Sequence, residues 1–343
     1  MRIALAALLV ALVTGCRSIG YYAHVAHGQA ALLHERRPID KVLADPKTPE
    51  ATRTRLERAS EARRFASRKL DLPDNRSYTY FVQLDRPWVA WNVFATPELS
   101  IAPVTHCFPV AGCVAYRGYF RKDLAEREAA REAALGHDVA IGEVPAYSTL
   151  GWFADPILSS MLRWDDDELA GTIFHELAHQ KIYVKDDSSF NESFATFVER
   201  EGLREWREAR EQPAPDGMGD ALERSFTEQV LALRDRLKAI YAEAWTEDAK
   251  RVAKAEAFED FRGRYLVWRH DEAGGDRRYD RWMSRRLNNA TLLPFGLYDT
   301  WVPSFATLFD ECGRAWPAFF ARVKRLSRLE PSERTRELER LRR

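Results

Sequence analysis

The stretch DDDELAGTIFHELAHQ, residues 165–180, decides how the second half of the chain is organised. The three aspartates at its start provide an N-cap and a negative first turn, both of which stabilise the beginning of a helix. Apolar residues then recur at helical spacing, at Leu169, Ile173, Phe174, Leu177 and Ala178. The sequence therefore predicts a helix from Asp166 onward with one buried face.

His175 and His179 are four residues apart, so both imidazoles project from one face of this helix, one turn apart. Two such nitrogens can bind one tetrahedral zinc ion. Glu176 can reach a water on that metal without being a ligand, and it can accept a proton that the zinc has made acidic. We therefore predict one Zn²⁺ per chain and Glu176 as general base. The alternative is a His-Glu-His pattern on a solvated helix face, which the apolar neighbours argue against.

A catalytic zinc needs a third protein ligand, and Glu192 follows His179 by thirteen residues within Asn191-Glu192-Ser193-Phe194-Ala195. Turn-forming residues in 183–189 let the chain reverse, so that a second helix brings Glu192 back over the first. Two alternatives stand beside this prediction. Ser189 and Glu192 also form a capping-box pattern, and Glu199 lies two turns further along the same helical face.

Strands precede helices along the chain. Residues 78–120 are rich in β-branched and aromatic residues, and we expect strands over 78–82, 88–95, 114–120, 138–141 and 146–150. Helices are expected over 19–36, 46–75, 122–135 and most of the chain after residue 166, with a break at 212–217. The charged tail after Arg325 is expected to form a loosely attached helix. This order predicts an α+β protein with one mature domain. Its residues 16–160 carry helices and a small mixed sheet, and residues 161–343 form a helical part with the zinc site.

The N-terminus suggests export. Met1-Arg2 is positive and residues 3–13 form an apolar run, which is shorter than the roughly twenty residues that span a bilayer. Residues 1–15 fit a secretory signal peptide. The segment 12–16, LVTGC, resembles a bacterial lipobox, in which Cys16 is lipidated and becomes the mature N-terminus. We expect an anchor in the bacterial envelope that faces the periplasm. The outer membrane is favoured because arginine, not aspartate, follows the cysteine. The alternative is an ordinary signal peptide with a chance cysteine.

Cysteine usage and charge narrow the chemistry further. Cys107 and Cys113 flank the turn-rich FPVAG, so export predicts a disulfide between them; two buried thiols are the alternative. No CxxC pattern offers a cysteine-based zinc site. His24 and His27 share a helical face, but no acidic or cysteine residue stands at ligand spacing from them. Lys plus Arg equals Asp plus Glu at 52 each, which argues against a nucleic-acid partner.

The expected partners are a peptide substrate and, through Cys16, a membrane. The sequence gives no oligomeric state.

Several of these stretches resemble known peptidases. HELAHQ (175–180) and NESFA (191–195) are similar to the HExxH and NEGFA pair of the aminopeptidase N type, although the spacing is shorter and no GAMEN-like segment precedes them. The chain more closely resembles the bacterial family of predicted aminopeptidases, which are exported gluzincins. That resemblance covers essentially the whole mature chain and includes the stretches CFPVAGC (107–113), YRGYF (116–120), YSTLGWF (147–153), LNNA (287–290) and WVP (301–303). It implies a zincin-like fold and a zinc peptidase, with exopeptidase action implied less firmly than peptide hydrolysis.

Three weaker predictions concern the substrate. Zincins carry a substrate-pairing edge strand upstream of the zinc helix, and the candidates here are Tyr147, Ser148, Thr149, Leu150 and Gly151. An ordinary loop is the alternative. Tyr298 is our candidate donor to the oxyanion, against simple core packing. Glu143 and Asp155 are the candidates for holding a free N-terminal amine, although Asp155 precedes a proline and can instead cap a helix.

Two alternative functions stand beside the aminopeptidase. One is an envelope endopeptidase, and the other is a non-catalytic lipoprotein with a structural metal.

Overall fold

Small sheets make up the β structure of the computed structural model, which describes residues 2–108, 112–213, 217–295 and 300–342. The first sheet has the order β1 (Arg37–Pro38), β2 (Tyr80–Val82), β8 (Ile157–Leu158), with an antiparallel and a parallel pairing. The second sheet is antiparallel, in the order β6 (Tyr116–Tyr119), β3 (Ala90–Pro97), β7 (His137–Val144). A hairpin of β4 (His106–Phe108) and β5 (Gly112–Val114) stands apart from both.

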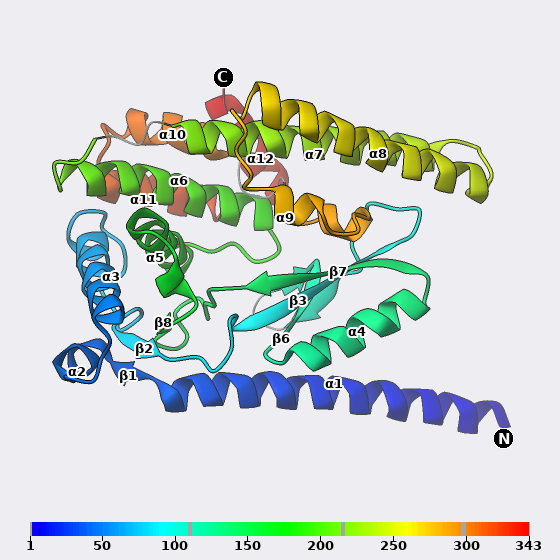
Figure 1. The fold of residues 1–343 in the computed structure, drawn as a ribbon, viewed down its shortest axis with the longest axis horizontal. Helices are drawn as coiled ribbons and strands as arrows, with labels where there is room; N and C mark the ends of the chain where they lie inside the picture. Colours follow the sequence, from blue (N-terminus) through cyan, green and yellow to red (C-terminus); the bar gives the residue numbers. More distant parts are fainter. Residues whose placement is uncertain (1, 109–111, 214–216, 296–299, 343) are drawn as a thin grey trace.

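Helices surround these sheets and dominate the C-terminal half (Figure 1). The N-terminal half contains α1 (Arg2–Glu35), α2 (Ile39–Ala44), α3 (Glu50–Arg68) and α4 (Lys122–Ala134). The C-terminal half contains α5 (Asp166–Lys181), α6 (Ser188–Glu208), α7 (Met218–Ala242), α8 (Glu247–Asp271), α9 (Asp280–Met283), α10 (Val302–Glu311), α11 (Trp316–Leu326) and α12 (Pro331–Arg342), with short 3₁₀ turns at Met161–Arg163 and Asn289–Leu292. The predicted α+β class and the mostly helical C-terminal half are confirmed, although separate small sheets replace the single mixed sheet that was expected.

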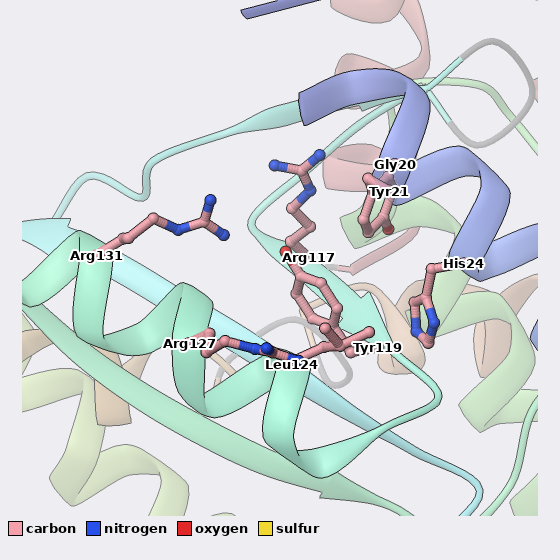
Figure 2. Close-up of a pocket in the computed structure, with 8 residues that line it drawn as sticks. All are labelled: Gly20, Tyr21, His24, Arg117, Tyr119, Leu124, Arg127 and Arg131. Atoms are coloured by element: carbon pink, nitrogen blue, oxygen red, sulfur yellow. The ribbon is translucent and has the colours of Figure 1, made fainter. Parts of the chain in front are cut away.

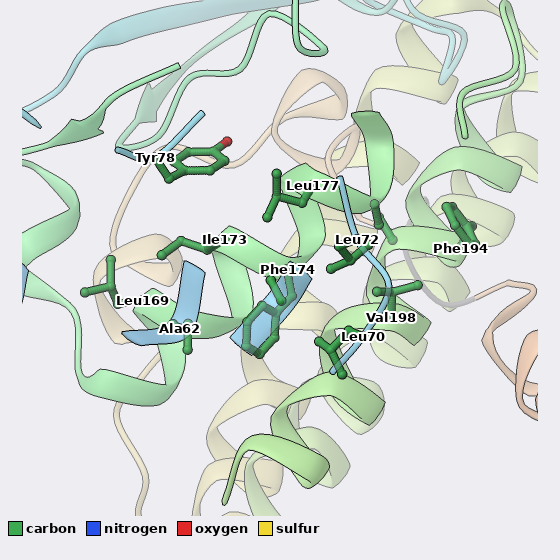
Figure 3. Packing of buried hydrophobic residues seen from close by; sticks show 14 of the residues in the cluster. Ala62, Leu70, Leu72, Tyr78, Leu169, Ile173, Phe174, Leu177, Phe194 and Val198 are labelled. Atoms are coloured by element: carbon green, nitrogen blue, oxygen red, sulfur yellow. The ribbon is translucent and has the colours of Figure 1, made fainter. Parts of the chain in front are cut away.

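The predicted apolar stripe of α5 lies in the main core. Leu169, Ile173, Phe174 and Leu177 are all fully buried, and Figure 3 shows their side chains within the packed cluster. The ring of Phe174 contacts Phe65 of α3 and Trp206 of α6, with centroids 6.1 and 6.5 Å apart. A second apolar cluster lies between α7 and α8, where Phe226 stacks on Tyr279. Packing in the main core holds α5 between α3 and α6, so the side chains on its other face project from a rigid helix.

The strand expected over 146–150 is not formed. These residues follow β7 as an irregular loop that ends in a turn, where Leu150 and Gly151 have φ values of 55° and 79°. The carboxylate of Asp155 accepts the Thr149 N–H at 3.1 Å and the Thr149 hydroxyl at 2.6 Å. A side chain has therefore taken the hydrogen bond that a neighbouring strand would have supplied.

The prediction of a loosely attached C-terminal tail is also wrong. Helix α12 packs on α10, with Leu338 and Leu341 each 1% exposed. The hydroxyl of Ser304 donates to the carbonyl of Leu338 at 2.7 Å. Two leucines three residues apart suffice for a buried face even when most of the helix is charged.

No helix among the described residues has both the length and the apolar character needed to cross a membrane.

Candidate metal centre

Helix α5 positions three of the predicted residues through its own geometry. It begins after Asp165, whose side chain accepts the Glu168 N–H at 2.8 Å as the predicted N-cap. From this start, His175 and His179 fall on one face, one turn apart, and their rings meet edge to face with centroids 4.8 Å apart. The side of the helix opposite the buried stripe thus carries two imidazoles directed at one point.

The three predicted ligand atoms converge. His175 Nε2 lies 3.1 Å from His179 Nε2, and Glu192 Oε2 lies 3.3 Å from the former and 3.5 Å from the latter. The ligand atoms of this cluster all lie within 4.8 Å of one another. Ligands roughly 2.0–2.1 Å from a tetrahedral zinc are separated by about 3.4 Å. The spacing of the two nitrogens and the carboxylate oxygen therefore fits one zinc ion between them.

Electrostatics at the cluster favour an added positive charge. Burial by itself lowers the pKa of His175, but hydrogen bonds to Glu192 and Glu199 outweigh it and raise that pKa to about 10. Burial alone raises the pKa of Glu192, but hydrogen bonds from His175 and His179 bring it well below its usual range. His179 Nδ1 is buried and has no hydrogen-bond partner among the described residues. A metal cation would take the place of the proton that these groups stabilise.

Glu199 lies behind His175 and does not belong to the converging set. Its Oε2 pairs with His175 Nδ1 at 2.9 Å, on the opposite side of the ring from the cluster. Gly171 on α5 leaves room for this carboxylate, because a Cβ there would lie 3.1 Å from Glu199 Oε1. With the proton at Nδ1, the lone pair of Nε2 points towards the cluster and can bind a metal. The geometry thus favours Glu192, rather than Glu199, as the third ligand.

The start of α6 places Glu192. Asp187, not Ser189, is the N-cap and accepts the Phe190 N–H at 3.1 Å, so the capping-box alternative is wrong. The amide of Asn191 donates to the Val184 carbonyl at 2.7 Å and accepts the Val184 N–H at 2.8 Å. Asn191 therefore fastens the α5–α6 linker to α6, and the next residue turns towards α5.

A cavity of about 510 Å³ opens beside the cluster. His175, Glu176, His179 and Glu192 line it, and so do three of the five predicted substrate-strand residues: Tyr147, Ser148 and Leu150. Thr149 instead bonds to Asp155, and Gly151 packs against Gln180. Glu176 reaches the cavity without taking part in the ligand cluster. The cavity thus brings the predicted base and ligands together with part of the predicted substrate segment.

The two candidates for binding a free amine are occupied elsewhere. Asp155 is 1% exposed and organises the 148–149 turn. Glu143 forms ion pairs with Arg281 and Arg285, each at 3.2 Å. Neither carboxylate lines the cavity.

Two tyrosines that the sequence did not single out line the cavity near Glu192. Partial burial, and then the charge of Glu192, raises the pKa of both Tyr183 and Tyr116. Both phenols therefore keep their proton at neutral pH and can donate a hydrogen bond. Tyr183 stands four residues after His179, a spacing that could have signalled it; Tyr116 lies on β6 and has no such local signal. Tyr298, our earlier candidate, lies outside the described residues.

A disulfide joins Cys107 and Cys113 across the β4–β5 hairpin. The Cys113 N–H donates to Asp186 Oδ1 at 2.9 Å, which ties the hairpin to the linker between α5 and α6. Cys312 is a free, partly buried thiol. The side chain of Cys16 lies outside what the structure describes.

An α+β fold with a His-His-Glu cluster in a cavity defines a candidate metal-binding protein. A family model described as "Putative aminopeptidase" matches residues 20–338, nearly the whole chain. The chain belongs to this family, which suggests a peptidase. Searches of curated proteins and of solved structures returned no match.

Proposed function

We propose that this protein is a zinc-dependent peptide hydrolase with a zincin-like fold, of the aminopeptidase type. One observation carries the proposal: His175 Nε2, His179 Nε2 and Glu192 Oε2 converge at a cavity that Glu176 enters without being a ligand. A site that only stabilised the fold would have no use for an unligated carboxylate beside the metal. Family membership supports the same conclusion.

The residues of the chain have distinct parts in the reaction. His175, His179 and Glu192 would hold a zinc ion, which when bound would make a water more acidic and polarise the peptide carbonyl. Glu176 accepts the proton of the attacking water and passes it to the leaving amine, so it acts first as base and then as acid. Tyr116 or Tyr183, protonated at neutral pH, donates to the carbonyl oxygen as negative charge develops there. Tyr298 remains a candidate for the same role.

We further propose that the chain is lipidated at Cys16 after removal of residues 1–15 and faces the periplasm, with the outer membrane favoured. The lipobox-like segment 12–16 and the apolar run before it support this. The proposal predicts that labelled fatty acid is incorporated into the wild type but not into Cys16→Ser. Fractionation of the membranes then tests which of them carries the protein.

Substitution of Glu176 tests the mechanism. Purified protein lacking residues 1–16 should bind zinc and cleave a peptide library. Glu176→Gln should keep its zinc and lose roughly 10²–10⁴-fold in kcat, because the base is gone while the ligands stay. Glu168→Gln, on the same helix but outside the cavity, is the matched control and should retain activity. Full activity in zinc-loaded Glu176→Gln would refute the proposed mechanism.

An envelope endopeptidase is the second candidate, and the positions of Asp155 and Glu143 favour it. Both are engaged away from the cavity, so neither can hold a free amine there. Paired peptides with free and acetylated N-termini separate the two functions. Cleavage of only the acetylated peptides would sink the aminopeptidase assignment.

A further inference from the structure

The cavity beside the metal centre has two chemically different sides. The side made by α5 and α6 carries His175, His179 and the carboxylates Glu176 and Glu192. Aromatic rings from α1, the β4–β5 hairpin, the end of β6 and the loop after β7 also line the cavity. We call these rings the aromatic wall: Tyr21, Phe108, Tyr119, Phe120 and Tyr147.

The aromatic wall forms two ring-contact groups joined by His24. Tyr21 contacts Phe108 and Tyr119, with ring centroids 6.0 and 5.5 Å apart. Phe120 contacts Tyr147 at 5.3 Å. The ring of His24 lies 5.9 Å from that of Tyr119 and 6.3 Å from that of Phe120. Four separate segments of the chain thus contribute to one apolar surface.

Several contacts hold the wall in place before any ligand arrives. The Phe120 N–H donates to His24 Nε2 at 3.0 Å. Gly28 lets α1 approach Phe120, since a Cβ there would overlap the phenyl ring. The guanidinium of Arg117 stacks over Tyr21, 4.0 Å from the ring centroid, beside a neighbouring pocket that Figure 2 shows. A wall that is already ordered loses little entropy when a ligand binds to it.

Two rings of the wall, Tyr119 and Phe120, are buried at 6% exposure, but the other three are not. Tyr21, Phe108 and Tyr147 stay half-buried, and the open volume of about 510 Å³ falls in the usual range for ligand sites. Among the described lining residues, the acidic side chains are Glu176 and Glu192 and there is no lysine or arginine. Apart from the proposed zinc ion, an acidic substrate side chain would find no cation among the described lining residues, and Glu176 and Glu192 would repel it.

We propose that the aromatic wall is the specificity pocket, which receives a large apolar side chain, aromatic or aliphatic, next to the scissile bond. This rests on the proposed peptidase function and names its substrate class. Burial of such a side chain against the wall should raise kcat/KM roughly tenfold to a hundredfold over alanine at the same position. Aspartate or glutamate at that position should be the poorest substrate.

A variant that adds a positive charge to the wall tests the proposal better than truncation. It predicts a gain in cleavage of the Asp peptide, which a misfolded protein could not produce. The substrates are peptides identical except for one residue, which is Phe, Leu, Ala, Asp or Lys, with the cleaved bond located by mass spectrometry. In wild type, Phe and Leu should be preferred. Phe108→Lys should lower kcat/KM for the Phe peptide at least about tenfold and raise it for the Asp peptide, because the wall then carries a cation.

Trp152→Lys is the matched control. Trp152 is 71% exposed and does not line the cavity, although Leu150, two residues away, does. It should keep the wild-type order of substrates. Equal cleavage of the Phe, Ala and Asp peptides by wild type, or an unchanged order in Phe108→Lys, would overturn the specificity pocket alone. Failure of zinc-loaded wild type to cleave any peptide would overturn the peptidase function and this inference with it.

Discussion

Besides Glu192, two glutamates adjoin His175, and their surroundings differ. Glu176 follows it on α5 and reaches the cavity, whereas Glu199 reaches from α6 to the ring nitrogen that faces away from the ligand cluster. The first can meet a water and a substrate, while the second can act only through the imidazole. In the proposed mechanism Glu176 would act on the water, and Glu199 would only position the imidazole of His175.

Glu199→Gln should weaken metal binding more than the catalytic step. Loss of a carboxylate behind a metal-binding histidine typically costs about 10–100-fold in metal affinity, because the ring orientation and basicity are no longer fixed. Competition with a chelator measures that affinity. Glu208→Gln on the same helix, exposed and paired with Arg204, should bind zinc like wild type. An unchanged zinc affinity in Glu199→Gln would show that His175 needs no such support.

The sequence predicted the cluster because its geometry is mostly local. A spacing of four on a helix places His175 beside His179, whatever the rest of the chain does. Glu192 needed only one reversal of the chain. Tyr116 could not be found this way, since it lies on β6 and shares the cavity with Glu192 only through the tertiary fold. The engagement of Asp155 by Thr149 was missed because a loop side chain can bond in many directions.

The linker between α5 and α6 depends on one amide. Asn191 satisfies both the N–H and the carbonyl of Val184. Asn191→Asp keeps the acceptor but places an oxygen against the Val184 carbonyl, so about 1–3 kcal/mol of stability should be lost. Chemical denaturation measures the loss, and zinc affinity should fall with it because Glu192 is the next residue. Wild-type stability in Asn191→Asp would mean that the linker holds its shape unaided.

Helix α1 is attached to the sheet through a histidine acting as an acceptor. Burial, and then Arg121 and His27, lowers the pKa of His24 from its usual 6.5, with Asp123 opposing. Arg121 and Asp123 lie at the start of α4, and His27 lies on α1 itself. Neutral His24 accepts the Phe120 N–H; a protonated ring cannot.

Acidification should therefore loosen α1. Because the folded pKa is depressed, His24 contributes stability above its unfolded pKa of 6.5 and loses it as the pH falls towards the folded pKa. Thermal unfolding at about pH 7.5 and about pH 5.5 should show a fall in Tm that is smaller in His24→Gln, whose amide oxygen can still accept. His270→Gln, with an exposed ring, should keep the full fall. Equal falls in wild type and His24→Gln would contradict this role.

Elements with strong periodicity were predicted well, and elements without it were not. The stripe of α5 and the helix-rich second half followed from spacing. The failed strand at 146–150 shows the limit: its short apolar and β-branched pattern is equally compatible with a loop once Asp155 supplies the hydrogen bonds. The two-residue β8 was too short to leave a pattern.

Helix α12 contacts the start of α6, the helix that carries Glu192. Arg334 on α12 has a side chain only 5% exposed and pairs with Asp187 at 2.7 Å, the residue that caps α6. Its guanidinium also lies over the ring of Phe190. The C-terminus thus helps to hold the helix that carries Glu192.

Arg334→Ala should cost about 2–4 kcal/mol of unfolding free energy, because it leaves a partly buried carboxylate without its partner. Arg340→Ala, which removes an exposed pair with Glu337, should change stability by less than about 0.5 kcal/mol. Urea denaturation of both variants makes the comparison. Equal unfolding free energies for Arg334→Ala and Arg340→Ala would show that the ion pair of Arg334 does not hold α12 in place.

Helix α1 has a consequence for where the proposed peptidase could reach its substrates. Tyr21, a part of the aromatic wall, follows Cys16 by only five residues on the same helix. At about 1.5 Å per residue, the wall begins about 8 Å along the helix from that cysteine. With the proposed lipid on Cys16, this short distance would keep the cavity close to the membrane surface. Substrates would have to come to the bilayer surface, and a polypeptide held far from the membrane would escape cleavage even if its sequence matched the pocket.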